Sequence, residues 1–180
     1  MNDPRRRLAI LEALAVGELN PMTEEETKMT RKTLFATALL ASAPAFAEDM
    51  VLPDLVRQAT PEAVVAEHLD ALNACDWNRL LAQYPDDAEI HLSGGTIITG
   101  RKAIGELFAG FCKPVAEGGL MGIRFTPEHS FVVGDTVNAQ WVGEADFLAE
   151  AYKGSDAYVT RDGLMAAMVT TFEGTDLKMK

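Results

Sequence analysis

Helical and strand-like periodicities occupy separate parts of this chain, and this separation constrains the fold more than any other feature. Between residues 60 and 113 apolar residues recur at helical spacing in three segments, whereas from about 121 to 173 they follow strand-like runs. Two short runs, 88–92 and 96–99, read as strands between the second and third helices. Helices followed by an antiparallel meander predict an α+β domain with about five or six strands packed on three N-terminal helices.

Each predicted helix has a recognisable beginning or end. Thr60 can cap the first helix, and Asp76 can cap a second, short helix that Pro85 follows. The third helix begins after Gly100 and ends before Pro114. The first helix carries one stripe expected to be buried, formed by Val65, His68, Leu69 and Leu72.

The strands are separated by turn signals. They cover about 121–133, 136–147, 155–161 and 164–173, with hairpin turns at Gly134-Asp135 and Asp162-Gly163. In the last run the even-numbered residues are mostly apolar, so we expect Met168 and Phe172 to face the interior. That parity requires a three-residue turn with Gly163 as a bulge, because a two-residue turn would reverse the faces.

Residues 29–47 have the composition of an export signal. Two basic residues precede an uncharged, mostly apolar run from 34 to 43, and Ala45 and Ala47 stand where a signal peptidase reads small residues. The run is shorter than the ~20 residues that span a bilayer. We therefore expect a periplasmic or secreted protein, cleaved after Ala47, with no stable membrane anchor after processing.

The export signal divides the rest of the chain into a segment before it and three segments after it. Residues 1–28 are interpreted as a non-native or disordered extension upstream of a start at Met29; a cytoplasmic tail with an uncleaved anchor is the alternative. Residues 48–59 are predicted to be a linker, 60–175 the folded domain and 176–180 a tail.

The acidity of the chain excludes some partners. Residues 48–180 contain ten Lys/Arg and twenty-one Asp/Glu and so carry the whole net charge of −11. Such a domain repels phosphate backbones and anionic lipid, so we expect no nucleic-acid partner.

The two cysteines, Cys75 and Cys112, lack the CxxC spacing of a thioredoxin-type redox site or a zinc ribbon. We expect two separate, half-buried thiols near helix ends, with pairing in an oxidising compartment as the alternative. The sequence also lacks HExxH, GxSxG, phosphate-loop and dinucleotide motifs, so we expect neither a metal nor a cofactor.

Five short segments follow one another in an order and at spacings typical of a known protein superfamily: Cys75-Asp76-Trp77, Tyr84-Pro85-Asp86-Asp87-Ala88, Gly100-Arg101-Lys102-Ala103-Ile104, Gly154-Ser155-Asp156-Ala157-Tyr158 and Arg161-Asp162-Gly163. Together they make residues 60–175 resemble the nuclear-transport-factor-2-like superfamily, in particular its SnoaL-like and ketosteroid-isomerase-like branch. The resemblance implies a cone-shaped, curved antiparallel sheet around the first helix, a mostly apolar cavity and a homodimer. Members include isomerases, cyclases, dehydratases, hydrolases and non-catalytic binders, so the fold alone gives no activity.

The resemblance points to two residues as candidate catalytic groups. Asp156 stands where the isomerases place an acid of the oxyanion hole, which burial keeps protonated so that it can donate a hydrogen bond. The alternative is a strand-end residue bonded to nearby backbone. His68 stands where they place a tyrosine of the first helix, and an imidazole there could polarise a carbonyl or move a proton. The alternative is a satisfied core histidine.

The general base of the isomerases has no counterpart here. The Asp86-Asp87-Ala88 run aligns Leu92 with that base and leaves His91 one residue earlier. His91 either faces the cavity, with its strand neighbours facing away, or is an exposed strand histidine. Six further residues are expected to line the cavity, with plain core packing as the alternative: Phe108, Phe125, Trp141, Tyr158, Met168 and Phe172.

Three functions follow from these observations. The first is an exported binding module for a small apolar or aromatic molecule. The second is a cofactor-free acid/base enzyme of the isomerase, dehydratase or hydrolase type that uses Asp156 and His68. The third is a dimeric interaction protein. The incomplete set of reactive groups favours the binding module over the enzyme.

Overall fold

The computed structural model describes residues 51–180, so the predicted leader and the segment before it lie outside the described residues. The observed elements are α2 (Pro61–Asn73), α3 (Trp77–Leu81), β1 (Glu89–His91), β2 (Ile97–Thr99), α4 (Arg101–Phe111), the 3₁₀ turn η1 (Val115–Glu117), β3 (Arg124–Val133), β4 (Thr136–Glu144), β5 (Tyr152–Arg161), β6 (Leu164–Thr170) and the 3₁₀ turn η2 (Gly174–Asp176). Within the described part, no helix is long and apolar enough to cross a bilayer.

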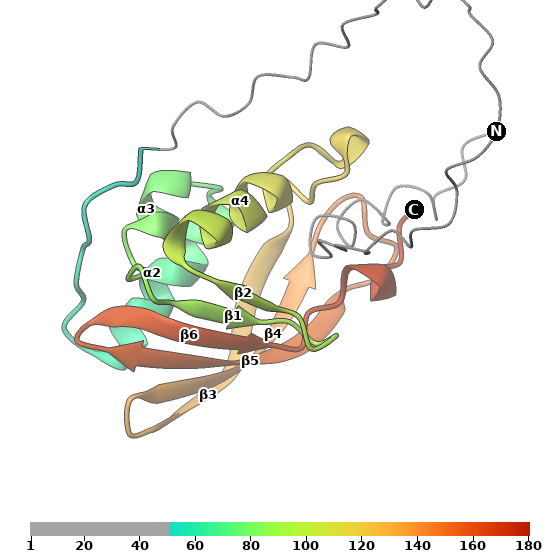
Figure 1. The fold of residues 1–180 in the computed structure, drawn as a ribbon. Helices are drawn as coiled ribbons and strands as arrows, with labels where there is room; N and C mark the ends of the chain where they lie inside the picture. Colours follow the sequence, from blue (N-terminus) through green and yellow to red (C-terminus); the bar gives the residue numbers. More distant parts are fainter. Residues whose placement is uncertain (1–50) are drawn as a thin grey trace, which may run out of the picture.

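The strands form one six-stranded sheet in the order β2-β1-β6-β5-β4-β3. The pair β1 and β6 is parallel, and the other neighbouring pairs are antiparallel. The three helices lie over one face of this curved sheet (Figure 1). The core fills the space between them with apolar side chains that include Val64, Leu80, Ile104, Val137 and Tyr158. The predicted α+β class and the curved sheet on three helices are thereby confirmed.

Local signals explain the path from α2 to α3. The Thr60 side chain accepts a hydrogen bond from the backbone N–H of Ala63 (3.2 Å), which caps α2 as predicted. At the other end Cys75 adopts a left-handed conformation (φ 49°), and its N–H and that of Asp76 return to carbonyls of the last turn. The Asp76 side chain then accepts from the N–H of Arg79 (3.1 Å) and caps α3, also as predicted.

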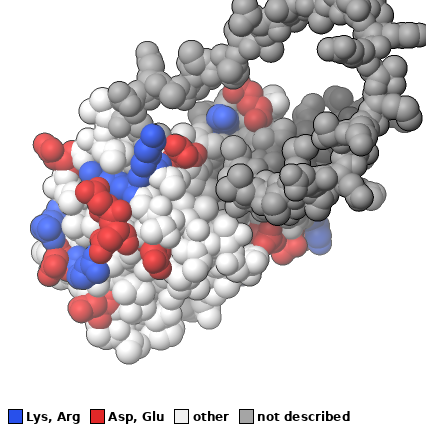
Figure 2. All heavy atoms as spheres, in the orientation of Figure 1, with Lys and Arg blue, Asp and Glu red and all other residues white. Residues whose placement is uncertain are grey.

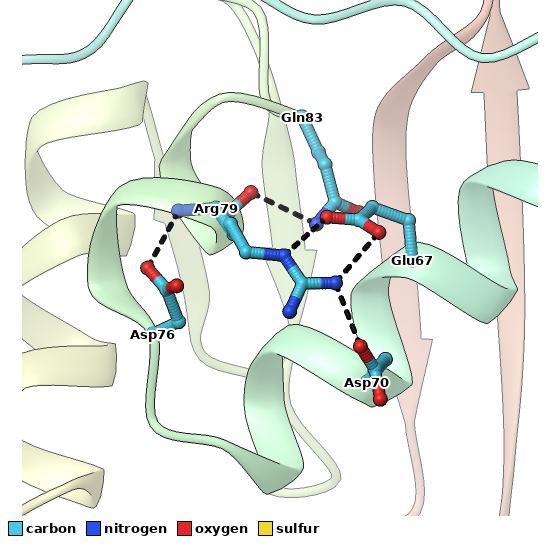
Figure 3. A network of polar contacts seen from close by, with 5 residues as sticks. All are labelled: Glu67, Asp70, Asp76, Arg79 and Gln83. Atoms are coloured by element: carbon cyan, nitrogen blue, oxygen red, sulfur yellow. Dashed lines mark hydrogen bonds and ion pairs between the residues drawn. The ribbon is translucent and has the colours of Figure 1, made fainter.

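A network of polar contacts fixes α3 on α2 (Figure 3). Arg79 donates from Nε and Nη2 to the two carboxylate oxygens of Glu67 (2.8 Å each) and from Nη2 to Asp70 (2.7 Å). Its carbonyl accepts from Nε2 of Gln83 (3.0 Å). Because the guanidinium is partly exposed, these ion pairs contribute orientation more than free energy. In the orientation of Figure 1, charged side chains of both signs cluster on one side of the domain, and the rest of the visible surface is mostly uncharged (Figure 2).

Cys75 and Cys112 form a disulfide, with their Cα atoms 5.6 Å apart. The expectation of two separate thiols is therefore wrong. Cys75 follows the C-terminal end of α2 and Cys112 follows that of α4, and the packing of the two helices brings these ends together. The bond ties the helix ends beside the cavity described below.

The β5–β6 hairpin differs from its predicted form. Its turn has two residues, Asp162 and Gly163, both with positive φ (53° and 74°), which is the pattern of a type I′ turn. The register then shifts so that Ala166 is an extra residue in β6. This bulge reverses the faces a second time, so Met168 points inward as expected, although the predicted three-residue turn is wrong.

The segment before α2 lies against the domain. The backbone N–H of Val56 donates to the carbonyl of Ala82 (2.8 Å), and that of Gln58 donates to the carbonyl of Gly163 (2.9 Å). The buried side chain of Arg101 also donates to the carbonyl of Pro53. Residues 51–59 are thus attached to α3, α4 and the β5–β6 turn.

Candidate functional site

A cavity of about 470 Å³ lies between the helices and the concave face of the sheet. Its size falls within the ~300–1,000 Å³ typical of small-molecule sites. All the residues predicted from the sequence except His91 line it: His68, Phe108, Phe125, Trp141, Asp156, Tyr158, Met168 and Phe172. The wall also includes residues that the sequence analysis did not assign to it, among them Leu107, Phe111, Leu120, Thr170 and Glu173.

For some of these additional residues, the sequence contains a pattern that could have placed them in the cavity wall. Leu107 and Phe111 recur at helical spacing with Phe108 on the apolar side of α4, and Thr170 shares the parity of Met168 in β6. No such pattern marks Glu173, because its place in the wall depends on where the chain runs after β6 has ended.

His91 lies outside the cavity wall. Its Nε2 atom is 2.8 Å from Oε2 of Glu89, and its side chain is 36% exposed. Its neighbours Ile90 and Leu92 point inward, Ile90 into the core and Leu92 into the cavity wall, because side chains alternate along a strand. The position that the resemblance aligns with a general base therefore presents an aliphatic side chain.

His68 is fully buried and lines the cavity. Its Nδ1 atom is 3.3 Å from the hydroxyl of Tyr84, and its ring packs against those of Tyr84, Phe108 and Tyr158 with centroids 5.7–6.0 Å apart. Burial lowers the pKa of His68 from 6.5 to about 4. At neutral pH the imidazole is therefore uncharged, with one nitrogen that donates and one that accepts.

Asp156 lies on the cavity face of β5. The hydroxyl of Tyr158 donates to its Oδ2 atom (2.8 Å), while Oδ1 has no hydrogen-bond partner among the described residues. Burial raises the pKa of Asp156, and nearby donors, Thr170 first and then Tyr158 and Trp141, oppose that rise. The Nε1 atom of Trp141 is also buried without a partner in the described part of the chain.

Tyr158 connects the two candidate groups. Its ring packs on His68 and its hydroxyl bonds to Asp156, whereas His68 itself bonds to Tyr84. The arrangement brings an uncharged imidazole and a carboxyl group to one end of an apolar cavity. It can bind and polarise a polar group there, and it holds no second carboxylate at the position aligned with a general base.

A second polar group lies elsewhere on the wall. The hydroxyl of Ser93 donates to Oε2 of Glu173 (2.5 Å), and that of Thr175 donates to Oε1 (3.3 Å). These bonds join the loop after β1 to the segment after β6. No Lys or Arg belongs to the cavity wall in residues 51–180, and no group of three His, Cys, Asp or Glu side chains there is placed to hold a metal ion.

Comparisons with known proteins agree with this architecture. The family model of the SnoaL-like domain matches residues 65–173. A nuclear-transport-factor-2-like protein of unknown function from Cytophaga hutchinsonii superposes with a TM-score of 0.52 and 14% identity, over 66% of this chain and 94% of that one. No curated protein matches the sequence significantly.

Two further solved structures carry ligand information in their descriptions. A computationally designed 17-OHP binder has a TM-score of 0.55 and 17% identity, over 68% of this chain and 98% of that one. TerC, co-crystallised with polyporic acid, has a TM-score of 0.53 and 18% identity, over 64% and 92% of the two chains. At these identities the likeness shows a shared fold.

Proposed function

This chain belongs to the SnoaL-like domain family, and from that membership we propose that it is a binding module for a small, largely apolar molecule. The observation that carries the proposal is the cavity itself, which is walled mainly by aliphatic and aromatic side chains and has a few polar groups, around Asp156 and around Glu173. Two similar structures, a 17-OHP binder and TerC with polyporic acid, support a small-molecule ligand, since each of these proteins holds one in the same fold.

The charges of the wall narrow the ligand further. Among residues 51–180, the acidic residues of the wall are Asp156 and Glu173, no Lys or Arg belongs to it, and His68 is uncharged at neutral pH. An anionic ligand would enter a low-dielectric space without a partner for its charge, which is costly. The proposed ligand is therefore uncharged at the end that reaches Asp156.

A cofactor-free acid/base enzyme is the second candidate. The pairs His68–Tyr84 and Asp156–Tyr158 favour it, because they place two proton-exchanging groups at one end of the cavity. Leu92 in the wall, at the position aligned with the isomerases' base, counts against an isomerase of that kind.

Thermal shift of the purified protein against steroid, terpenoid and polycyclic aromatic compounds tests the binding function. A ligand at 100 times its Kd is expected to stabilise the protein by about 2.7 kcal/mol. Leu107→Trp should abolish the shift, because its indole fills the cavity. Ala109→Trp is the matched control, since it adds the same ring on the exposed side of α4.

The outcomes separate the two candidates. A stabilising compound recovered unchanged supports the binder, whereas a converted compound, with turnover lost in Asp156→Asn, supports the enzyme. If no compound shifts the wild-type Tm, or if Leu107→Trp and Ala109→Trp respond alike, the cavity is not the binding site.

We further propose that the protein is exported, with cleavage after Ala47. The sequence of residues 29–47 supports this, and so does the disulfide, because such bonds persist mainly in oxidising compartments.

A homodimer is proposed through the outer face of the sheet. Phe131, Val133 and Val169 lie on that face and are 60%, 64% and 48% exposed. Exposed apolar residues close together on one face are typical of protein–protein contacts.

Native mass spectrometry of the protein purified from its own cells checks both of these proposals. We expect a chain that begins at Glu48 and a complex of twice that mass. A chain retaining residues 29–47 would contradict cleavage, and a monomer at micromolar concentration would contradict the dimer.

A further inference from the structure

Two buried polar atoms of the cavity wall lack hydrogen-bond partners, and they differ in kind. Within residues 51–180, the buried side-chain nitrogen and oxygen atoms without a partner are Oδ1 of Asp156, Nε1 of Trp141 and Oε1 of Gln83. The first two belong to residues of the cavity wall, and Gln83 does not. Buried polar atoms in native proteins are nearly always paired, so an unpaired acceptor and an unpaired donor at one cavity require an explanation.

We infer that the ligand carries a hydroxyl group held between Oδ1 of Asp156 and Nε1 of Trp141. The inference rests on the proposed binding function and adds the chemical group that the cavity selects. It makes Trp141, which the sequence suggested only as an apolar wall, a residue that determines specificity.

The sheet places the two side chains next to each other. Asp156 is on β5 and Trp141 on β4, and these strands pair so that Ala139 lies opposite Asp156 and Gly154 opposite Trp141. Both side chains line the cavity. The indole N–H is close enough to Asp156 to favour its carboxylate form, yet the two groups do not complete a hydrogen bond.

Packing holds the indole of Trp141 in this position. A Cβ atom at Gly154 would lie 2.5 Å from Cζ2 and Cη2 of the ring, so the ring occupies the space that a side chain there would need. The ring of Phe125 meets it edge-on with centroids 5.1 Å apart, and Tyr152 packs at 5.8 Å. Because the ring is enclosed by these groups, its N–H is fixed beside the cavity.

A hydroxyl matches this donor and acceptor with a single oxygen atom. It accepts from the indole N–H and donates to the carboxylate oxygen. With Asp156 as the carboxylate, an ether or a ketone, which only accepts, would leave Oδ1 unpaired in a buried site. A carboxylate would bring a negative charge into a wall that, within residues 51–180, contains no Lys or Arg to offset it.

Three compounds with one carbon frame test the inference: 4-phenylphenol, 4-methoxybiphenyl and biphenyl-4-carboxylate. Isothermal titration calorimetry of the wild-type protein at pH 7.5 is expected to give a Kd about tenfold lower, or better, for the phenol than for the ether, since one hydrogen bond to a buried acceptor separates them. The carboxylate should bind most weakly of the three.

Variants assign the preference to its residues. Trp141→Phe and Asp156→Ala should each reduce the phenol-to-ether ratio to within about twofold. Phe172→Leu is the matched control, because it removes an aromatic ring from the wall and that ring carries no polar atom. It should weaken both compounds together and keep their ratio.

The wild-type comparison decides the inference even if a variant does not fold. Equal affinity for phenol and ether would overturn it, as expected if Asp156 and Trp141 bond directly to each other, while the proposed binding function would stand. If none of the three compounds binds, the proposed apolar ligand is contradicted and this inference falls with it.

Discussion

Reduction of the Cys75–Cys112 disulfide is expected to lower the free energy of unfolding by about 3–4 kcal/mol. The bond closes a loop across 37 positions of the sequence, and the loss of loop-closure entropy in the unfolded chain for that length corresponds to about this value. Guanidinium unfolding with and without a reductant measures the difference. A change below about 0.5 kcal/mol would show that the bond adds little to stability.

Reduction of the disulfide should also weaken ligand binding in the cavity. Asn73, two residues before Cys75, donates to the carbonyl of Phe125 (2.9 Å) and accepts from its N–H (2.7 Å), and α4 supplies Leu107, Phe108 and Phe111 to the wall. Reduction releases the ends of α2 and α4, which loosens the Asn73–Phe125 hydrogen bonds and the position of the α4 side chains in the wall. Reduced protein should therefore bind a cavity ligand more weakly.

Serine and glycine variants separate the bond from the backbone strain at Cys75. A Cys75→Ser/Cys112→Ser double variant should be insensitive to reductant. Cys75→Gly/Cys112→Ser should be more stable than that variant by about 1 kcal/mol, because glycine adopts the left-handed conformation of position 75 without a Cβ penalty.

Acidification from pH 7 to pH 4 is expected to cost about 3 kcal/mol of stability through His68. Burial lowers its folded-state pKa to about 4 from an unfolded value of 6.5, and each unit corresponds to about 1.4 kcal/mol. Between these values the unfolded chain binds a proton at His68 that the folded protein does not. Stability is therefore full above pH 6.5 and falls as the pH drops toward 4.

Asp156 acts in the opposite direction. Its folded-state pKa is raised by burial, so the folded protein holds a proton there more tightly, and this contribution to stability is lost as the pH rises through the folded-state pKa. The measured profile is the sum of both groups and the other titrating residues, which is why the contribution of His68 must be taken as a difference between variants.

Denaturant unfolding of the wild type and His68→Gln from pH 7 to pH 4 provides that difference. Glutamine keeps a polar group near Tyr84 but does not titrate, so the variant should lose about 2–3 kcal/mol less stability than the wild type over this range. His129→Gln, on the exposed strand β3, is the control and should follow the wild-type profile. Parallel profiles for His68→Gln and the wild type would contradict a buried, neutral imidazole.

Local rules were sufficient for many elements of the fold. The cap of α2 at Thr60 and the cap of α3 at Asp76 depend on residues within a few positions of one another, and the structure confirms both. The last hairpin also turns at Asp162-Gly163 as predicted, although with two residues in place of the three expected. The stripe on α2 places His68 in the interior for the same reason, because helical periodicity is a local property.

Pairing between distant segments determined the rest. The bulge at Ala166 reverses the faces of β6, and no residue type in that strand predicts the bulge. The outward position of His91 follows from which side of β1 meets the core, which is fixed by pairing with β6.

Residue types and their spacing were enough to predict the α+β order of elements, the helix caps and the apolar character of the cavity wall, and the resemblance added the candidate roles of His68 and Asp156. The packed fold was needed to show that Cys75 meets Cys112, that Glu173 meets Ser93 and that Trp141 leaves its N–H beside Asp156 without a bond. The physical reason is that periodicity and capping arise within a few residues, whereas these contacts join segments that approach only when the helices and the curved sheet have packed.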